Sequence, residues 1–200
     1  MNMSNFLKTI FLALVIVAAF FVPVAAVVPV DVITLPASDK SGGMPLMRAL
    51  NERKSLRAFT DEAISQQDLS NLLWAAFGIN RADGRRTAPT ARNSQQVRIY
   101  AAMANGVWLY DAAKHALYKV LERDVTQSFH APLTLVYAVA DDKYGPMHAG
   151  AVFQNVGLYC ASAGLGNVVK AQGVNVLTND ELKLPADYAV VIVQSVGRPR

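Results

Sequence analysis

Cysteine and histidine are nearly absent from this chain of 200 residues. The single cysteine, Cys160, excludes an intramolecular disulfide framework and any zinc site built from several cysteines. The three histidines, His115, His130 and His148, fall on different predicted elements, so we expect no metal centre. Charge of one sign is also scarce, because 19 basic and 15 acidic side chains leave a net charge of +4. This mild charge argues against a protein that coats a polyanion.

Standard catalytic motifs are missing as well. The chain has no Gly-x-Ser-x-Gly elbow, no Walker loop and no His-Glu-x-x-His sequence. Gly164-Leu165-Gly166 begins like a dinucleotide-binding fingerprint, but it lacks the third glycine and follows a predicted helix instead of opening one. Cys160 lies on the apolar stripe of that helix, which favours a buried structural thiol over a nucleophile. The sequence therefore predicts no catalytic side chain.

The N-terminus is strongly apolar. Residues 1–9 carry one lysine, residues 10–30 carry no charge, and small residues follow at Val24-Ala25-Ala26. This pattern is typical of a secretory signal peptide, here residues 1–26, and predicts export to the periplasm or another extracytoplasmic location. An uncleaved membrane anchor is the alternative, since about 20 apolar residues can span a bilayer. Pro23 and Pro29 interrupt the stretch and favour cleavage.

The remaining chain divides into a leader arm, residues 27–44, and one domain, residues 45–200. A capping box at Ser65–Asp68 opens the clearest predicted helix, and Asn105-Gly106 is a strong hairpin turn. A second capping box occurs at Thr178–Glu181. We predict helices over 45–54, 66–77, 112–123 and 146–163, and strands over 97–103, 107–110, 133–140, 168–169 and 188–196. Hairpin-linked strands mixed with helices indicate an α+β domain.

Arginine clusters in two places. Arg53, Lys54 and Arg57 surround Ser55, and Arg198 and Arg200 end the sequence. Arginine is suited to bidentate capture of phosphate, and serine adds a hydroxyl donor. A solvated basic face is the structural alternative.

Arginines also occur in the polar loop over residues 79–96, namely Arg81, Arg85, Arg86 and Arg92. This loop leaves a binder of nucleic acid or another polyanion as a further hypothesis. The loop lacks interleaved aromatic side chains, and export argues against such a partner, so we expect no nucleic acid.

Several stretches resemble the nitroreductase-like FMN oxidoreductases. Residues 53–59 (RKSLRAF) are similar to the family's R-R-S-x-R-x-F motif, and 72–80 (LLWAAFGIN) to its second helix. Residues 88–95 (APTARNSQ) resemble its P-S-A-x-N-x-Q flavin loop. Residues 163–173 (AGLGNVVKAQG) resemble the late glycine segment beneath the isoalloxazine ring, and 196–199 the final strand. The resemblance covers about residues 45–200.

The resemblance implies a nitroreductase-like α+β fold, with a central antiparallel or mixed sheet flanked by helices, and a homodimer. It implies FMN as the cofactor, which carries the chemistry, with NAD(P)H as a possible electron donor and a nitroaromatic or quinone-like acceptor. Arg53, Ser55 and Arg57, with Lys54, would hold the phosphate and ribityl chain, joined by Arg198 and Arg200. Pro89, Thr90, Ala91 and Asn93 would line the isoalloxazine, and backbone N–H groups near Gln172 and Gly173 would face N5 and O4.

A flavin-binding or ligand-binding module of the same fold without turnover is the alternative function. The short C-terminus and the short helices at the position of the family's substrate pocket favour this alternative. Lys54 in place of the second arginine is a further departure from the motif, since lysine lacks a bidentate fork. The complete set of expected flavin contacts favours the enzyme.

Overall fold

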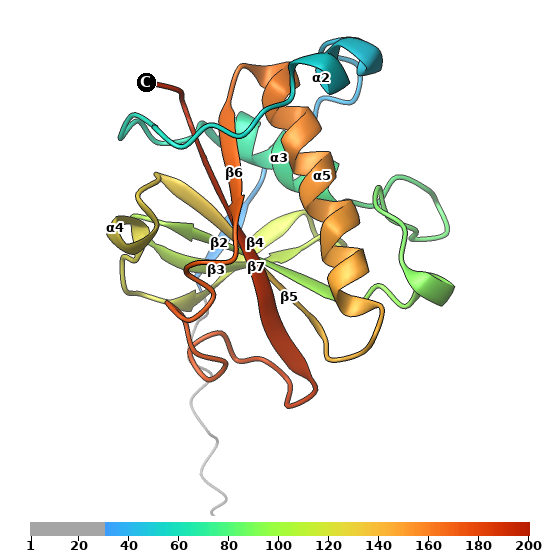
Figure 1. Cartoon of the computed structure of the whole chain (residues 1–200). Helices are drawn as coiled ribbons and strands as arrows, with labels where there is room; N and C mark the ends of the chain where they lie inside the picture. The colour runs from blue at the N-terminus through green and yellow to red at the C-terminus, as the bar shows by residue number, and fades with distance from the viewer. Residues whose placement is uncertain (1–30) are drawn as a thin grey trace, which may run out of the picture.

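The structure, a computed structural model, describes residues 31–200, and the predicted signal peptide lies outside these residues. Its centre is a seven-stranded sheet in the order β1-β4-β3-β2-β5-β7-β6, with every neighbouring pair antiparallel (Figure 1). The strands are β1 (Val32–Thr34), β2 (Val97–Met103), β3 (Gly106–Asp111), β4 (Ala116–Leu121), β5 (Leu133–Ala140), β6 (Gly166–Lys170) and β7 (Tyr188–Gly197). The helices are α2 (Leu46–Glu52), α3 (Gln66–Phe77), α4 (Thr126–Phe129) and α5 (Gly145–Ala163). The predicted α+β class is confirmed.

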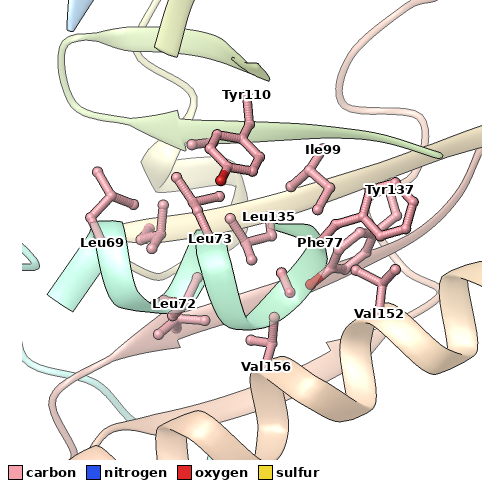
Figure 2. Packing of buried hydrophobic residues seen from close by; sticks show 14 of the residues in the cluster. Leu69, Leu72, Leu73, Phe77, Ile99, Tyr110, Leu135, Tyr137, Val152 and Val156 are labelled. Carbon is pink, nitrogen blue, oxygen red and sulfur yellow. The ribbon is translucent and has the colours of Figure 1, made fainter. Parts of the chain in front are cut away.

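Helix α3 forms where its sequence signals place it. The Ser65 hydroxyl accepts the Asp68 N–H at 3.0 Å, as expected of a helix cap. Leu69, Leu72 and Leu73 recur at helical spacing, so one face of α3 is apolar and becomes buried. Figure 2 shows this face between the sheet and α5, against Ile99, Leu135 and Tyr137 on one side and Val152 and Val156 on the other. The main core therefore lies between the sheet and the helices α3 and α5.

The central strands are buried on both faces. Successive residues of β2 alternate, so Ile99 and Ala101 join the core under α3 while Tyr100 and Ala102 join a second core. That second core packs against Phe129 of α4 and against Leu177 and Leu182 of the turns between β6 and β7. Burial on both faces explains why β5 is apolar at every position but Thr134 instead of alternating.

The predicted helix over Ala112–Arg123 is wrong, because this segment forms a turn and then β4. The Asp111 carboxylate accepts the N–H groups of Ala113 and Lys114 at 2.8 and 3.1 Å, and His115 follows in the left-handed region with φ of 47°. Strand β4 then pairs with β3 on one side and β1 on the other. The sequence ALYKVL has apolar residues compatible with either structure, and strand pairing decided between them.

Two other segments also differ from the sequence-based expectation. In the leader arm, Val32–Thr34 forms edge strand β1 instead of irregular chain. At the second capping box, Thr178 and Glu181 exchange the expected hydrogen bonds, but a series of turns follows instead of a helix. Lys183 has a φ of 50° and Pro185 comes two residues later, and both oppose continuation of a helix.

Within residues 31–200, no helix is long and apolar enough to cross a membrane.

Candidate functional site

The predicted phosphate-binding segment, residues 53–57, leaves the end of α2 as extended chain and lies against the sheet. Leu56 donates its N–H to the Asn167 carbonyl of β6 at 2.8 Å. Farther along, Phe59 forms a bridge with Pro199, and Thr60 donates its N–H to the Arg198 carbonyl at 2.9 Å. These backbone contacts bring the first arginine cluster beside the C-terminal end of the chain, as the sequence analysis expects.

All side chains of this segment except that of Leu56 are polar and can donate hydrogen bonds. Among residues 31–200, no side-chain hydrogen bond or ion pair involves Arg53, Lys54, Ser55 or Arg57. Arg53 is half-buried and its stem passes over Gly157 of α5, where an added methyl group would lie 3.5 Å from Arg53 Cδ. Two guanidinium groups, an ammonium and a hydroxyl without internal partners form a donor set that suits a phosphate. The residues present therefore fit the phosphate end of FMN.

The two C-terminal arginines differ in how closely their guanidinium groups already contact carboxylates. Arg198 Nε lies 2.9 Å from Glu62 Oε1, and its Nη2 lies 3.8 Å from Asp68 Oδ2, so its guanidinium already faces carboxylates. Arg200 has a looser contact, with Nη2 3.8 Å from Asp61 Oδ2 on the surface. Arg200 is therefore the more available of the two for an anionic ligand.

Arg200 lines two cavities. The larger, about 780 Å³, is lined by Arg57 and Arg200 with apolar side chains such as Phe59 and Leu133. The smaller, about 690 Å³, is lined by Lys54, Asn167 and Arg200. Both volumes are in the range of cofactor and ligand sites. Three of the predicted phosphate-binding residues thus line these cavities, namely Lys54, Arg57 and Arg200.

Gln172 and Gly173 follow β6. Gly173 has a φ of 98°, a backbone conformation that favours glycine, and an added methyl group there would lie 3.2 Å from the Phe129 ring. His130, which follows Phe129 in the sequence, lines the larger cavity. Gln172 and Gly173 are not among the residues that line this cavity, and Gly173 faces the second core through Phe129.

The predicted flavin loop, Pro89–Asn93, lies elsewhere. It contacts the first turn of α5, where the Ala91 N–H donates to His148 Nε2 at 2.8 Å. Arg53 contacts α5 at Gly157, nine residues further along. Nine residues of helix advance about 13 Å, and Figure 1 shows the two segments on opposite sides of α5. The single chain does not bring the two halves of the predicted site together.

Sequence reasoning missed two residues that support these segments. Asn167 accepts the Leu56 N–H through its backbone, and its side-chain oxygen accepts from buried Gln194 at 2.9 Å. His148 supports the flavin loop, whereas sequence reasoning favoured a generic structural or surface role for each histidine. Asn167 lies within the stretch 163–173 that resembles the family's glycine segment, but that resemblance assigns no role to its side chain, and His148 belongs to none of the quoted motifs. The tertiary contacts alone indicate what the two residues support.

Acidic, cysteine and histidine side chains do not gather in the described part of the chain. Across residues 31–200 no group of three or more such residues is placed to hold a metal ion. The candidate site is therefore one of arginines, hydroxyls and backbone N–H groups.

Known structures share this arrangement of sheet and helices. A nitroreductase-type protein from Ralstonia eutropha JMP134 is 33% identical and superposes with a TM-score of 0.77, covering 86% of this chain and 99% of the other. An FMN-dependent nitroreductase from Clostridium difficile R20291 is 17% identical, with a TM-score of 0.55 over 78% of this chain and 90% of its own, and shows the fold alone. The fold is that of an α+β oxidoreductase.

Sequence comparison leads to the same family. A nitroreductase homologue of Methanocaldococcus jannaschii is 26% identical over an alignment of 147 residues, and the match covers 60% of this chain and 74% of that protein. The model of the Nitroreductase family matches residues 50–198. The chain therefore belongs to the Nitroreductase family, and the resemblance inferred from its motifs is confirmed.

Proposed function

We propose that this protein is an FMN-dependent oxidoreductase that passes electrons from a reduced donor to an electron-poor acceptor such as a nitroaromatic or a quinone. The observation that carries the proposal is the set of donors at Arg53, Lys54, Ser55 and Arg57, which have no side-chain partner within residues 31–200, in a chain of the Nitroreductase family. Lys54 and Arg57 line the two cavities. Bound FMN would supply hydride-transfer and electron-transfer chemistry that the side chains lack.

The chain's own residues would bind and orient the cofactor. Arg53 and Ser55 would donate to the phosphate, and Arg57 would hold the ribityl chain or the phosphate from the larger cavity. Gly173, which has no side chain, would let the backbone approach the ring closely. Asn93 would hydrogen-bond the pyrimidine edge. None of these roles requires a catalytic acid or nucleophile, which agrees with the absence of such motifs.

A homodimer would complete this site. The flavin loop and the first arginine cluster lie apart in one chain, so a second copy would supply the missing half to each site. Helix α2 supports this proposal, because Leu46, Met47 and Leu50 are 63%, 76% and 44% exposed. An exposed apolar face of this kind is typical of an interaction surface.

The cellular location of the protein would determine which electron donor it can use. The apolar N-terminus favours export, and outside the cytoplasm a membrane quinol would replace NAD(P)H as the reductant. Inside the cytoplasm, NAD(P)H would serve. Both donors deliver electrons to the same flavin, so the proposal for the site does not depend on the location.

The purified full chain should carry a visible flavin absorbance band, and denaturation should release FMN. Anaerobic addition of NADPH, NADH or a quinol should bleach the band, and a quinone or nitroaromatic should restore it. The donor that bleaches it identifies the reductant. A bound flavin that no donor reduces would favour the binding module without turnover. Failure to bind FMN at all would contradict the proposal.

Replacing Cys160 with alanine is expected to leave turnover within about two-fold of the unmodified protein. The thiol is fully buried, and burial raises its pKa, so the reactive thiolate is disfavoured. Lost packing should cost about 1 kcal/mol of stability. Thermal unfolding and steady-state rates measure the two effects. Lost turnover in a variant that still holds flavin would show that the sulfur takes part in the reaction.

A further inference from the structure

His148 is a buried hydrogen-bond acceptor in the first turn of α5. Its side chain is 5% exposed, and its Nε2 accepts the Ala91 N–H at 2.8 Å. A backbone N–H can only donate, so Nε2 must carry a lone pair and the proton of the neutral ring lies on Nδ1. The ring stacks on Tyr144, with centroids 6.3 Å apart and planes inclined by 18°. The imidazole is thus oriented toward the loop that contains Ala91.

That loop has an unusual backbone. Arg92, Asn93 and Gln95 have φ values of 54°, 54° and 53°, in the left-handed region that residues other than glycine seldom adopt. Such a conformation persists where surrounding contacts hold it, and it is frequent at ligand-binding sites. The loop therefore needs contacts that fix its shape.

Most hydrogen bonds of the loop stay within its own neighbourhood. Gln95 donates its N–H to Thr90 Oγ1 at 3.0 Å and accepts from Arg86 Nε at 2.8 Å. For residues 89–93, the bond from Ala91 to His148 is the one hydrogen bond in the described structure that reaches a residue outside 84–97. It joins a strained loop to a long helix that is packed into the core.

We propose that His148 is a positioning residue for flavin binding, which acts through the Ala91 N–H to hold the loop over residues 89–93 in its binding conformation. The inference rests on the proposed function for the role of the loop, and on the observed hydrogen bond for the role of the histidine. His148 touches neither cofactor nor substrate in this assignment. Its effect is on the shape of the loop.

Two substitutions at His148 separate hydrogen bonding from packing. His148→Leu fills much of the same buried space but removes the acceptor, and should raise the FMN dissociation constant at least about ten-fold. His148→Gln keeps an oxygen acceptor near the place of Nε2 and should stay within about three-fold. Flavin fluorescence titration of the flavin-free full-length chain gives the dissociation constants. Hydrogen exchange of a peptide covering residues 88–96 should be faster in the leucine variant and unchanged in the glutamine variant.

A third substitution removes the donor and leaves α5 intact. Ala91 opens a short 3-10 helix and Thr90 before it is extended, with φ of −132° and ψ of 148°, so proline is compatible with position 91. Ala91→Pro should weaken FMN binding as much as His148→Leu does. The double variant should be no weaker than either single one, because both remove the same hydrogen bond. If His148→Leu does not fold, Ala91→Pro and His148→Gln still provide the comparison.

The matched control is Val152→Ala, one turn further along α5. Val152 is fully buried in the main core, so this variant loses packing but should keep both loop exchange and FMN affinity within about two-fold. Unchanged FMN affinity and loop exchange in His148→Leu would overturn the inference. An equal loss of FMN affinity in Val152→Ala would also overturn it. Additive losses of affinity in the double variant His148→Leu/Ala91→Pro would do the same. If the unmodified chain binds no FMN, the proposed function fails, and the exchange rates alone decide the role of His148.

Discussion

Replacing both Arg53 and Arg57 with alanine is expected to weaken FMN binding by at least about 100-fold. A hydrogen bond to a charged group contributes roughly 1.5–3 kcal/mol, which corresponds to about ten-fold or more for each arginine. In the described part of the chain, residues 31–200, neither guanidinium has a side-chain partner that would compensate for the ligand. Titration of the flavin-free protein, followed by quenching of flavin fluorescence, measures the change. The FMN affinity of Arg57→Lys should lie between that of the unmodified protein and that of the double alanine variant, because lysine keeps the charge and loses the planar fork.

Arg48→Ala is the matched control for charge. Arg48 lies on α2, one turn and a half before Arg53, and forms an exposed ion pair with Glu52 at 2.7 Å. Its loss changes the net charge by the same amount as either single substitution, Arg53→Ala or Arg57→Ala, and should leave FMN affinity within about two-fold. Arg198→Ala addresses the prediction for the C-terminal arginines, and its existing carboxylate contacts predict a smaller loss than for Arg53→Ala. An unchanged affinity in the double variant would contradict the phosphate assignment.

Two variants that each lose flavin are expected to restore flavin binding when they are combined in one dimer. The first is Arg53→Ala/Arg57→Ala, and the second is Thr90→Ala/Asn93→Ala in the flavin loop. If each site takes its phosphate segment from one subunit and its loop from the other, a mixed dimer has one intact site and one doubly defective site. Coexpression with two different affinity tags isolates the mixed dimer. Its flavin content should be about half that of the unmodified protein.

The control uses the arginine variant with both tags, which should give a dimer without flavin. Light scattering gives the oligomeric state, and dilution that dissociates the dimer should release flavin. A mixed dimer without flavin would show that the site does not cross between subunits. A monomer that retains FMN would contradict the dimer itself.

The elements that sequence analysis predicted correctly have strong local signals. Helix α3 has its cap at Ser65, an apolar stripe and a terminating glycine within fourteen residues, and the β2–β3 hairpin has Asn105-Gly106. The prediction of a helix over 112–123 was wrong because the apolar pattern of Ala116–Leu121 fits the periodicity of a helix and that of a strand. Strand β3 lies close enough to pair with this segment. The box at Thr178 and Glu181 formed its hydrogen bonds without a helix, since a cap fixes one turn and later residues decide whether it continues.

The sequence by itself determined the residue types of the candidate site, because motifs such as RKSLRAF and APTARNSQ are contiguous and can be read without coordinates. It also showed that the standard catalytic motifs are absent, and the family resemblance implied that a flavin carries the chemistry. The tertiary structure alone decided which of these residues lie together. Arg198 is paired with Glu62, Arg200 lies at both cavities, and the loop over residues 89–93 lies about 13 Å along α5 from Arg53. Such contacts join residues far apart in the chain, and their partners are set by the packing of helices on the sheet, which no local pattern encodes.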